Sequence, residues 1–179
     1  LHASLLGLVT LSDAFVYLLL QRRLEIAVGY FPLFPLGTAL VYLMSAVPLG
    51  RLADGLGRWR MFLFGNLALV GVYGLLLSPV GGAWLLGCTL TLHGLYYAAT
   101  NGVLMADVSP MLAPELRTSG LALIQTGTAL AGLASSIAFG ALWSAAGHDT
   151  AVRIFLCGLL AMLLPNLVIA WRRPGDSPA

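Results

Sequence analysis

The chain has 179 residues, of which 59% are hydrophobic and only 9% are charged, and its formal net charge is +2. Soluble domains usually carry about 25% charged residues, so a water-soluble globular enzyme is excluded. The small, dispersed positive charge also excludes a nucleic-acid-binding surface. What remains is a protein that crosses a lipid bilayer several times.

Six apolar stretches are each about long enough for a helix that crosses a bilayer, which needs about 20 such residues. In chain order they cover residues 3–20, 34–50, 61–78, 84–106, 119–145 and 154–171. Backbone polar groups in lipid must bond within their own segment, so such runs predict helices rather than strands. We therefore expect an all-α polytopic membrane protein with six transmembrane helices in a single bundle over residues 1–179.

Arginines between these stretches predict the orientation of the bundle. If the helices alternate, six arginines lie on one face and three on the other: Arg51, Arg58, Arg60, Arg117, Arg172 and Arg173 against Arg22, Arg23 and Arg153. The positive-inside rule places the six in the cytoplasm, with both termini and a tail at 172–179. No cleavage site follows the first apolar stretch, so we expect it to be retained. Because the chain begins with Leu1, we expect it to be a piece of a longer protein.

Two segments of equal spacing indicate an internal repeat. Residues 50–57 and 140–147 each begin and end with Gly, and each closes the second helix of a three-helix unit. Because three is odd, consecutive units have opposite orientations, which gives an inverted 3+3 repeat over 3–79 and 84–171. The motif is short, so coincidence is the alternative.

The densest polar cluster is the segment 50–60, which follows the second apolar stretch. Its glycines permit a tight turn between two antiparallel helices. Asp54 can accept hydrogen bonds from a helix N-terminus or pair with an arginine. An ordinary cytoplasmic loop would also account for these residues.

This segment resembles the loop between the second and third helices of each half of major facilitator superfamily transporters. The matching residues are Gly50, Leu52, Ala53, Asp54, Gly57 and Arg58, in the pattern G-x-L-A-D-x-x-G-R, whereas Gly55 and Trp59 stand where the family has basic residues. The segment 114–118 is similar to the stretch before the fifth helix of a half. Residues 12–15 and 21–23 look like the family's seventh helix. The resemblance covers the whole chain and implies the C-terminal half of a transporter of about twelve helices.

The resemblance implies that the chain moves a small solute by alternating access, with proton-coupled efflux as one form. It implies a latch that holds two six-helix bundles in one conformation, formed here by Gly50, Asp54, Gly57 and Arg58. The implied partners are the lipid bilayer, the missing N-terminal six-helix half or a second copy, a small-molecule substrate and protons. The implied location is a bacterial inner membrane. We expect no cofactor, no metal and no nucleic acid.

Polar side chains inside the apolar stretches predict an internal cavity. Asp13 and His93 each lie about ten residues into the first helix of a repeat, and an ionisable group in lipid usually faces a cavity. Together they could bind a proton or a polar substrate group. The predicted substrate or proton cavity, which includes a stripe at helical spacing, comprises Asp13, Tyr17, His93, Tyr97, Asn101 and Gln125. Simple hydrogen bonding between helices is the alternative.

Small residues at four-residue steps in the fifth stretch, Gly132, Ser136 and Gly140, predict close helix packing. An intramembrane hydrolase would need a nucleophile with a histidine, or a metal-ligand cluster, and neither pattern occurs. We therefore expect no enzymatic activity and no catalytic residues. The alternative to a transporter half is a non-transporting remnant or an assembly subunit that needs another six-helix half. The substrate, the direction of transport and the coupling ion stay open.

Overall fold

The computed structural model describes residues 9–108 and 117–172, and the regular secondary structure of this part is exclusively helical. In chain order the elements are α2 (Asp13–Leu24), the short 3-10 helix η1 (Val28–Tyr30), α3 (Leu33–Leu56), α4 (Arg58–Leu77), α5 (Gly82–Val108), α6 (Arg117–Ala146) and α7 (His148–Arg172). The all-α prediction is confirmed for these residues. The segments 3–8, 114–116 and 173–179, which also carry predictions, lie outside them.

Four described segments are long and apolar enough to cross a membrane. They are Val28–Leu56, Arg58–Leu77, Thr118–Ala146 and His148–Asn166. The described part of the first predicted crossing, α2, has only 12 residues. The fourth, α5, is long enough but carries polar side chains such as His93 and Asn101, and it is not among the four. Length and composition thus support four of the six predicted crossings.

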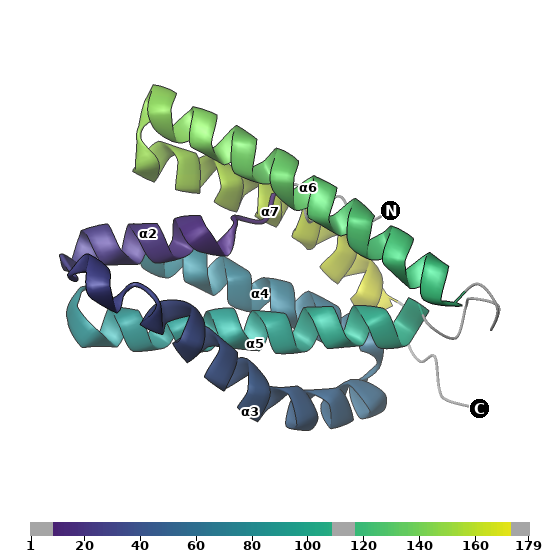
Figure 1. Cartoon of the computed structure of the whole chain (residues 1–179). Coiled ribbons are helices and arrows are strands. Elements are labelled where there is room, and N and C mark those ends of the chain that lie inside the picture. The colour runs from purple at the N-terminus through teal and green to yellow at the C-terminus, as the bar shows by residue number, and fades with distance from the viewer. Residues whose placement is uncertain (1–8, 109–116, 173–179) are drawn as a thin grey trace.

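Two central helices, α4 and α5, organise the bundle. Figure 1 shows α3 along one side of them and the α6–α7 pair along the other, and α7 packs directly against α4. Two glycines permit the close crossings. A Cβ atom at Gly94 of α5 would lie 2.7 Å from Val41 of α3, and one at Gly65 of α4 would lie 2.9 Å from Cβ of Ala99. Because backbone and side chains meet there without space for a methyl group, glycine sets both helix separations.

The main apolar core lies between α2, α4, α6 and α7. Leu20, Leu69, Phe139 and Leu159 are completely buried within it. Phe139 also packs against three other aromatic rings, those of Phe15, Trp143 and Phe155, at centroid separations of 4.8, 5.8 and 5.2 Å. These contacts hold the start of α2 against the α6–α7 pair.

The helix predicted first in the chain begins later than expected within the described residues. We expected one helix over 3–20, but α2 begins only at Asp13, and Ser12 before it has an extended backbone. Side chains from neighbouring helices bind the preceding main chain. The Tyr73 hydroxyl accepts a hydrogen bond from the Leu11 N–H at 2.6 Å, and the Ser135 hydroxyl donates to the Thr10 carbonyl at 2.6 Å. Because buried backbone groups outside a helix need such partners, these two bonds stabilise the segment before α2 and place Asp13 at a helix start.

The turns after α3 and α6 are built alike. Gly57 and Gly147 both have positive φ, 93° and 82°, a conformation that favours glycine. Each accepts a hydrogen bond from the residue four positions later and donates one to the residue four positions earlier. The expected loop over 50–57 is shorter than predicted, because Gly50 and Gly55 lie within α3 and only Gly57 makes the turn.

Arg23 fastens the end of α2 to the end of α4. Its guanidinium donates to the carbonyls of Leu75 at 3.1 Å and Leu76 at 2.7 Å, and also to that of Ser78. A helix C-terminus carries unpaired carbonyls and a partial negative charge, so a planar cation with several donors suits this position. We call this region, where α2 and α4 end and α3 and α5 begin, the α2 end of the bundle.

Candidate functional site: an internal polar cavity

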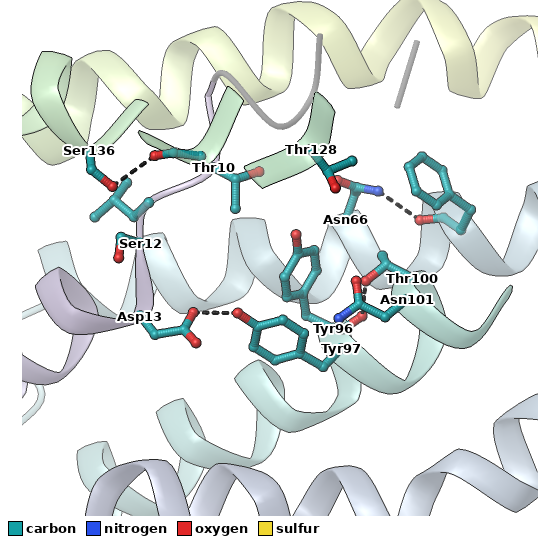
Figure 2. Close-up of a pocket in the computed structure, with 13 residues that line it drawn as sticks. Thr10, Ser12, Asp13, Asn66, Tyr96, Tyr97, Thr100, Asn101, Thr128 and Ser136 are labelled. Atoms are coloured by element: carbon teal, nitrogen blue, oxygen red, sulfur yellow. Dashed lines mark hydrogen bonds between the residues drawn. The ribbon is translucent and has the colours of Figure 1, made fainter. Parts of the chain in front are cut away.

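A cavity of about 330 Å³ lies where the start of α2 meets α4, α5 and α6. Most of the residues that line it carry a polar group, with hydroxyl and amide groups from all four regions (Figure 2). The lining residues are Thr10, Leu11, Ser12, Asp13, Phe62, Asn66, Tyr96, Tyr97, Thr100, Asn101, Thr128, Gly132 and Ser136. Among the described residues that line it, Asp13 alone carries a charge. The volume is at the small end of the range for ligand pockets.

Asp13 is the centre of a three-residue hydrogen-bond cluster. Its Oδ1 atom lies 3.1 Å from Nε2 of His93 and also accepts a hydrogen bond from the hydroxyl of Tyr97. Figure 2 shows Asp13 and Tyr97 pointing toward one another. The Asp13 side chain is 43% exposed, whereas that of His93 is 0% exposed. The carboxylate therefore faces the cavity while its imidazole partner lies behind it.

The backbone also favours a negative charge at Asp13. This residue is the first of α2, where unpaired N–H groups and the helix dipole stabilise an anion by about 0.3–1 kcal/mol. Without the break before α2, the same carboxylate would lie in the middle of a helix and lose this stabilisation. The start of α2 at Asp13 is thus part of the construction of the site.

Three tyrosine rings pack around the imidazole of His93. The rings of Tyr17 and Tyr97 lie edge-on to the imidazole at centroid separations of 5.9 and 5.3 Å, and that of Tyr96 is stacked on it at 6.1 Å. Tyr17 itself is buried and packs against Phe34 of α3. These contacts fix the ring plane, so Nε2 is directed at the carboxylate.

The cluster combines an exposed carboxylate with two fixed hydrogen-bond donors. Such a group can bind a cation or hold a proton, and its two donors orient Oδ1 for either task. In the described part of the chain, no three His, Cys, Asp or Glu side chains gather into a group that could hold a metal ion. The site suits binding and proton exchange.

The structure brings together five of the six predicted cavity residues. Asp13, Tyr97 and Asn101 line the cavity, while Tyr17 and His93 lie behind its wall as described above. Gln125, the sixth predicted residue, has an exposed side chain and is not among the residues that line this cavity. The helical phase of α6 turns Thr128 inward instead.

The predicted packing stripe on α6 also has a different role. Gly132 and Ser136 line the cavity, and a Cβ at Gly132 would meet no other described atom within 4 Å. At Gly140 a Cβ would lie 3.6 Å from the Phe15 ring, which is ordinary contact. The glycines that do bring helices together are Gly65 and Gly94, which the sequence analysis did not single out.

Asn66 and the segment before α2 were also missed as cavity residues. Asn66 is buried on α4 and donates to the Phe62 carbonyl at 2.8 Å. A polar amide in the third apolar stretch was a usable signal. Thr10 and Ser12 carried no comparable signal, because the helix break that turns them toward the cavity depends on Tyr73 and Ser135.

The four predicted latch residues lie at the α3–α4 turn. Gly50 and Asp54 belong to the last turns of α3, Gly57 is the turn itself, and Arg58 begins α4. Asp54 is exposed, and Arg58 is partly buried. Their role as a latch stays a prediction.

Comparison with known proteins gives no further evidence on the family of this chain. No protein-family model matches the chain, and no match was found among curated proteins or solved structures. The resemblance to the major facilitator superfamily therefore rests on the residues of the sequence.

Proposed function

We propose that the chain is the C-terminal half of a secondary transporter of the major facilitator type, which moves a small polar solute across a membrane by alternating access. The observation that carries this proposal is a polar cavity inside a bundle of apolar helices, with a carboxylate at its wall. Ionisable groups inside apolar helices are costly and almost always face the interior of the bundle or a water-filled cavity, which an aqueous path through a transporter provides.

The Asp13–His93–Tyr97 cluster supports proton coupling. A carboxylate held by two donors can exist with or without a proton, and its charge determines how well the cavity binds a cation. A solute and a proton that compete for Asp13 would be exchanged across the membrane. Proton-coupled efflux is therefore the form of transport that we favour.

The lining also narrows the class of solute. Asp13 supplies a negative charge, and the described lining residues include no arginine or lysine. An organic acid would meet repulsion there, whereas an organic cation or a hydroxyl-bearing neutral solute would meet matching partners. We therefore favour a small amine or polyhydroxyl compound.

The architecture of the turns supports the inverted repeat. Gly57 and Gly147 end segments of the same spacing and share one hydrogen-bond pattern, as two copies of a three-helix unit would. In this proposal the units cover residues 3–79 and 84–171, and the α3–α4 turn with Asp54 and Arg58 is the latch. The six-arginine face, with both termini, is cytoplasmic, and the membrane is a bacterial inner membrane.

A second helical unit completes the proposal. Large apolar side chains are exposed along α3 and α6, including Leu43, Met44, Leu130 and Ile137. These faces suit lipid or the helices of a missing N-terminal half or a second copy. The cavity of a lone half would lack an opposing wall, so the alternative function is an assembly subunit that does not transport alone.

The experiment measures solute uptake into liposomes that contain the chain, alone and together with the rest of the longer protein. Choline and ethidium serve as cationic probes, and an imposed pH gradient provides the driving force. We expect uptake driven by the pH gradient, and its loss in Asp13→Asn, because the amide cannot change charge.

Asp149→Asn is the matched control, because Asp149 is an exposed acid near the start of α7 and outside the cavity. Its uptake should equal that of the unmodified protein. Proton-driven uptake that survives in Asp13→Asn would remove Asp13 from the coupling mechanism. If neither probe nor a panel of sugars and amines is transported in any arrangement, the alternative of a non-transporting subunit replaces the proposal.

A further inference from the structure

The two ring nitrogens of His93 have different surroundings. Nε2 faces Asp13 at the cavity wall, at 3.1 Å from its Oδ1. Nδ1 is buried and finds no hydrogen-bond partner among the described residues. An ionised carboxylate only accepts hydrogen bonds, so Nε2 carries a proton in this pair, and Nδ1 of the neutral imidazole then presents a lone pair. A buried acceptor without a donor costs about 1–3 kcal/mol.

Two threonine hydroxyls share this condition. Oγ1 of Thr89 and Oγ1 of Thr38 are also buried and unpartnered within the described ranges. Thr89 lies one turn before His93 on the same face of α5. Thr38 faces the same crossing from α3, because a Cβ at Gly94, the residue after His93, would lie 2.9 Å from the Thr38 carbonyl oxygen.

Tyr17 links Thr38 to the imidazole. Its hydroxyl neighbours that of Thr38 without forming a hydrogen bond of ordinary geometry, and its ring lies edge-on to His93 at 5.9 Å. The three unpartnered atoms thus belong to one crossing of α3 and α5. They comprise one acceptor and two hydroxyls, each of which can donate and accept.

We propose that a water molecule binds between Thr38, Thr89 and Nδ1 of His93, and that His93 passes protons between this water and Asp13. Buried water typically makes about three hydrogen bonds to polar groups that otherwise lack partners. Here it donates to Nδ1 and to one hydroxyl and accepts from the other. The relay rests on the proposed function, because it supplies the proton that the coupling requires.

The position of His93 along α5 gives the relay a direction. Thr89 is seven residues after Gly82, which is roughly 10 Å from the α2 end at 1.5 Å per residue. Tyr97 and Asn101, which line the cavity, follow His93 in the opposite direction. His93 therefore separates the cavity from a polar cluster that lies nearer the α2 end.

The transfer balances in two steps. A proton that arrives at the α2 end as hydronium binds the lone pair of Nδ1, and water is left behind. The Nε2–H bond then breaks with its electron pair kept by the ring, and the proton binds Oδ1 of Asp13. Asp13 becomes neutral, and the imidazole ends as the other neutral tautomer. The reverse transfers restore the start, so Asp13 can gain and lose its proton through His93 rather than through the cavity.

Nitrogen-15 NMR of the purified full chain, labelled at histidine, tests the water site. The His93 signals are assigned from their loss in His93→Gln. We expect magnetisation transfer from water to the His93 ring and a hydrogen-bonded Nδ1 shift. Both should be lost in the double variant Thr38→Val with Thr89→Val, which removes the hydroxyls and keeps the side-chain shape.

Thr91→Val is the matched control, because Thr91 is exposed on the same helix and its hydroxyl donates to the Gly87 carbonyl at 2.7 Å. It should leave the His93 signals unchanged. Unchanged signals in the double variant, or no water contact in the unmodified chain, would overturn the proposal. If the double variant does not fold, as judged by its helical circular dichroism, the two single variants replace it, and each should weaken the water contact.

Ethidium uptake separates this proposal from the proposed function. In the double variant we expect uptake driven by the pH gradient to fall, while uptake down the ethidium gradient is kept. If both are kept, the relay is wrong and the transport function stands. If the unmodified protein shows the water contact but transports nothing, the relay role and the transport function both fail and only the water site survives.

Discussion

Gly94→Ala tests whether a single glycine sets the distance between α3 and α5. The new Cβ would lie 2.7 Å from Val41 Cβ and 2.9 Å from the Thr38 carbonyl oxygen, whereas ordinary contact begins at 3.4 Å. The main chain fixes both the Val41 Cβ and the Thr38 oxygen, so neither can rotate away. The closer contact, with Val41 Cβ, requires α3 to withdraw by about 0.7 Å, the difference between 3.4 and 2.7 Å. Overpacking of this kind typically costs about 1–3 kcal/mol.

Gly87→Ala supplies the matched control on the same helix. A Cβ there meets no other described atom within 4 Å, so only the helix preference of alanine remains, a gain of up to about 1 kcal/mol. That gain is common to both variants and cancels in their comparison. Gly94→Ala should therefore be less stable than Gly87→Ala by about 1–3 kcal/mol.

The assay is reversible unfolding in mixed micelles at increasing dodecyl sulfate fraction, followed by far-ultraviolet circular dichroism. The difference in the free energy of unfolding between the two variants is the measured quantity. Equal stabilities, within about 0.5 kcal/mol, would show that α3 does not contact α5 at Gly94, and the geometry around His93 would have to be redrawn.

Three further substitutions test other parts of the bundle in the same unfolding assay. Arg23→Lys should cost about 1 kcal/mol, because a lysine cannot donate to several carbonyls at once. The exposed position of Arg23 limits the loss. An unchanged midpoint of the unfolding curve would contradict this prediction. Tyr73→Phe should cost about 1–3 kcal/mol, because the Leu11 N–H loses its hydrogen-bond acceptor. Tyr42→Phe, at an exposed tyrosine, should leave the stability unchanged. Equal effects of the two substitutions would refute the anchoring of the segment before α2. Gly57→Ala should cost about 1–3 kcal/mol through its positive φ, and a cost no larger than that of Gly147→Ala at the equivalent turn is expected; a stabilising Gly57→Ala would exclude this turn.

Local sequence determined the helices and most of their limits. Apolar runs without strand alternation leave the backbone no partner but itself, so the stretches 61–78 and 84–106 agree closely with α4 and α5. Glycine at 57 and 147 likewise marked two turns, because a positive φ is a property of a single residue. The polar stripe from His93 to Asn101 indicated which face of α5 meets polar groups, since helical spacing is also local.

Only the tertiary structure decided where the site is and what builds it. The break before Asp13 depends on hydroxyls of Tyr73 and Ser135, which lie more than 60 residues away in the chain. The rotation of α6 that faces Thr128 inward and Gln125 outward is set by packing against α7 and α2, not by the sequence of α6. From the sequence, Asp13 and His93 were expected only to lie at the same depth in their helices. The 3.1 Å contact between them requires α2 and α5 to meet. Long-range contacts have no periodic signal in a single sequence, because they arise where distant side chains happen to fit.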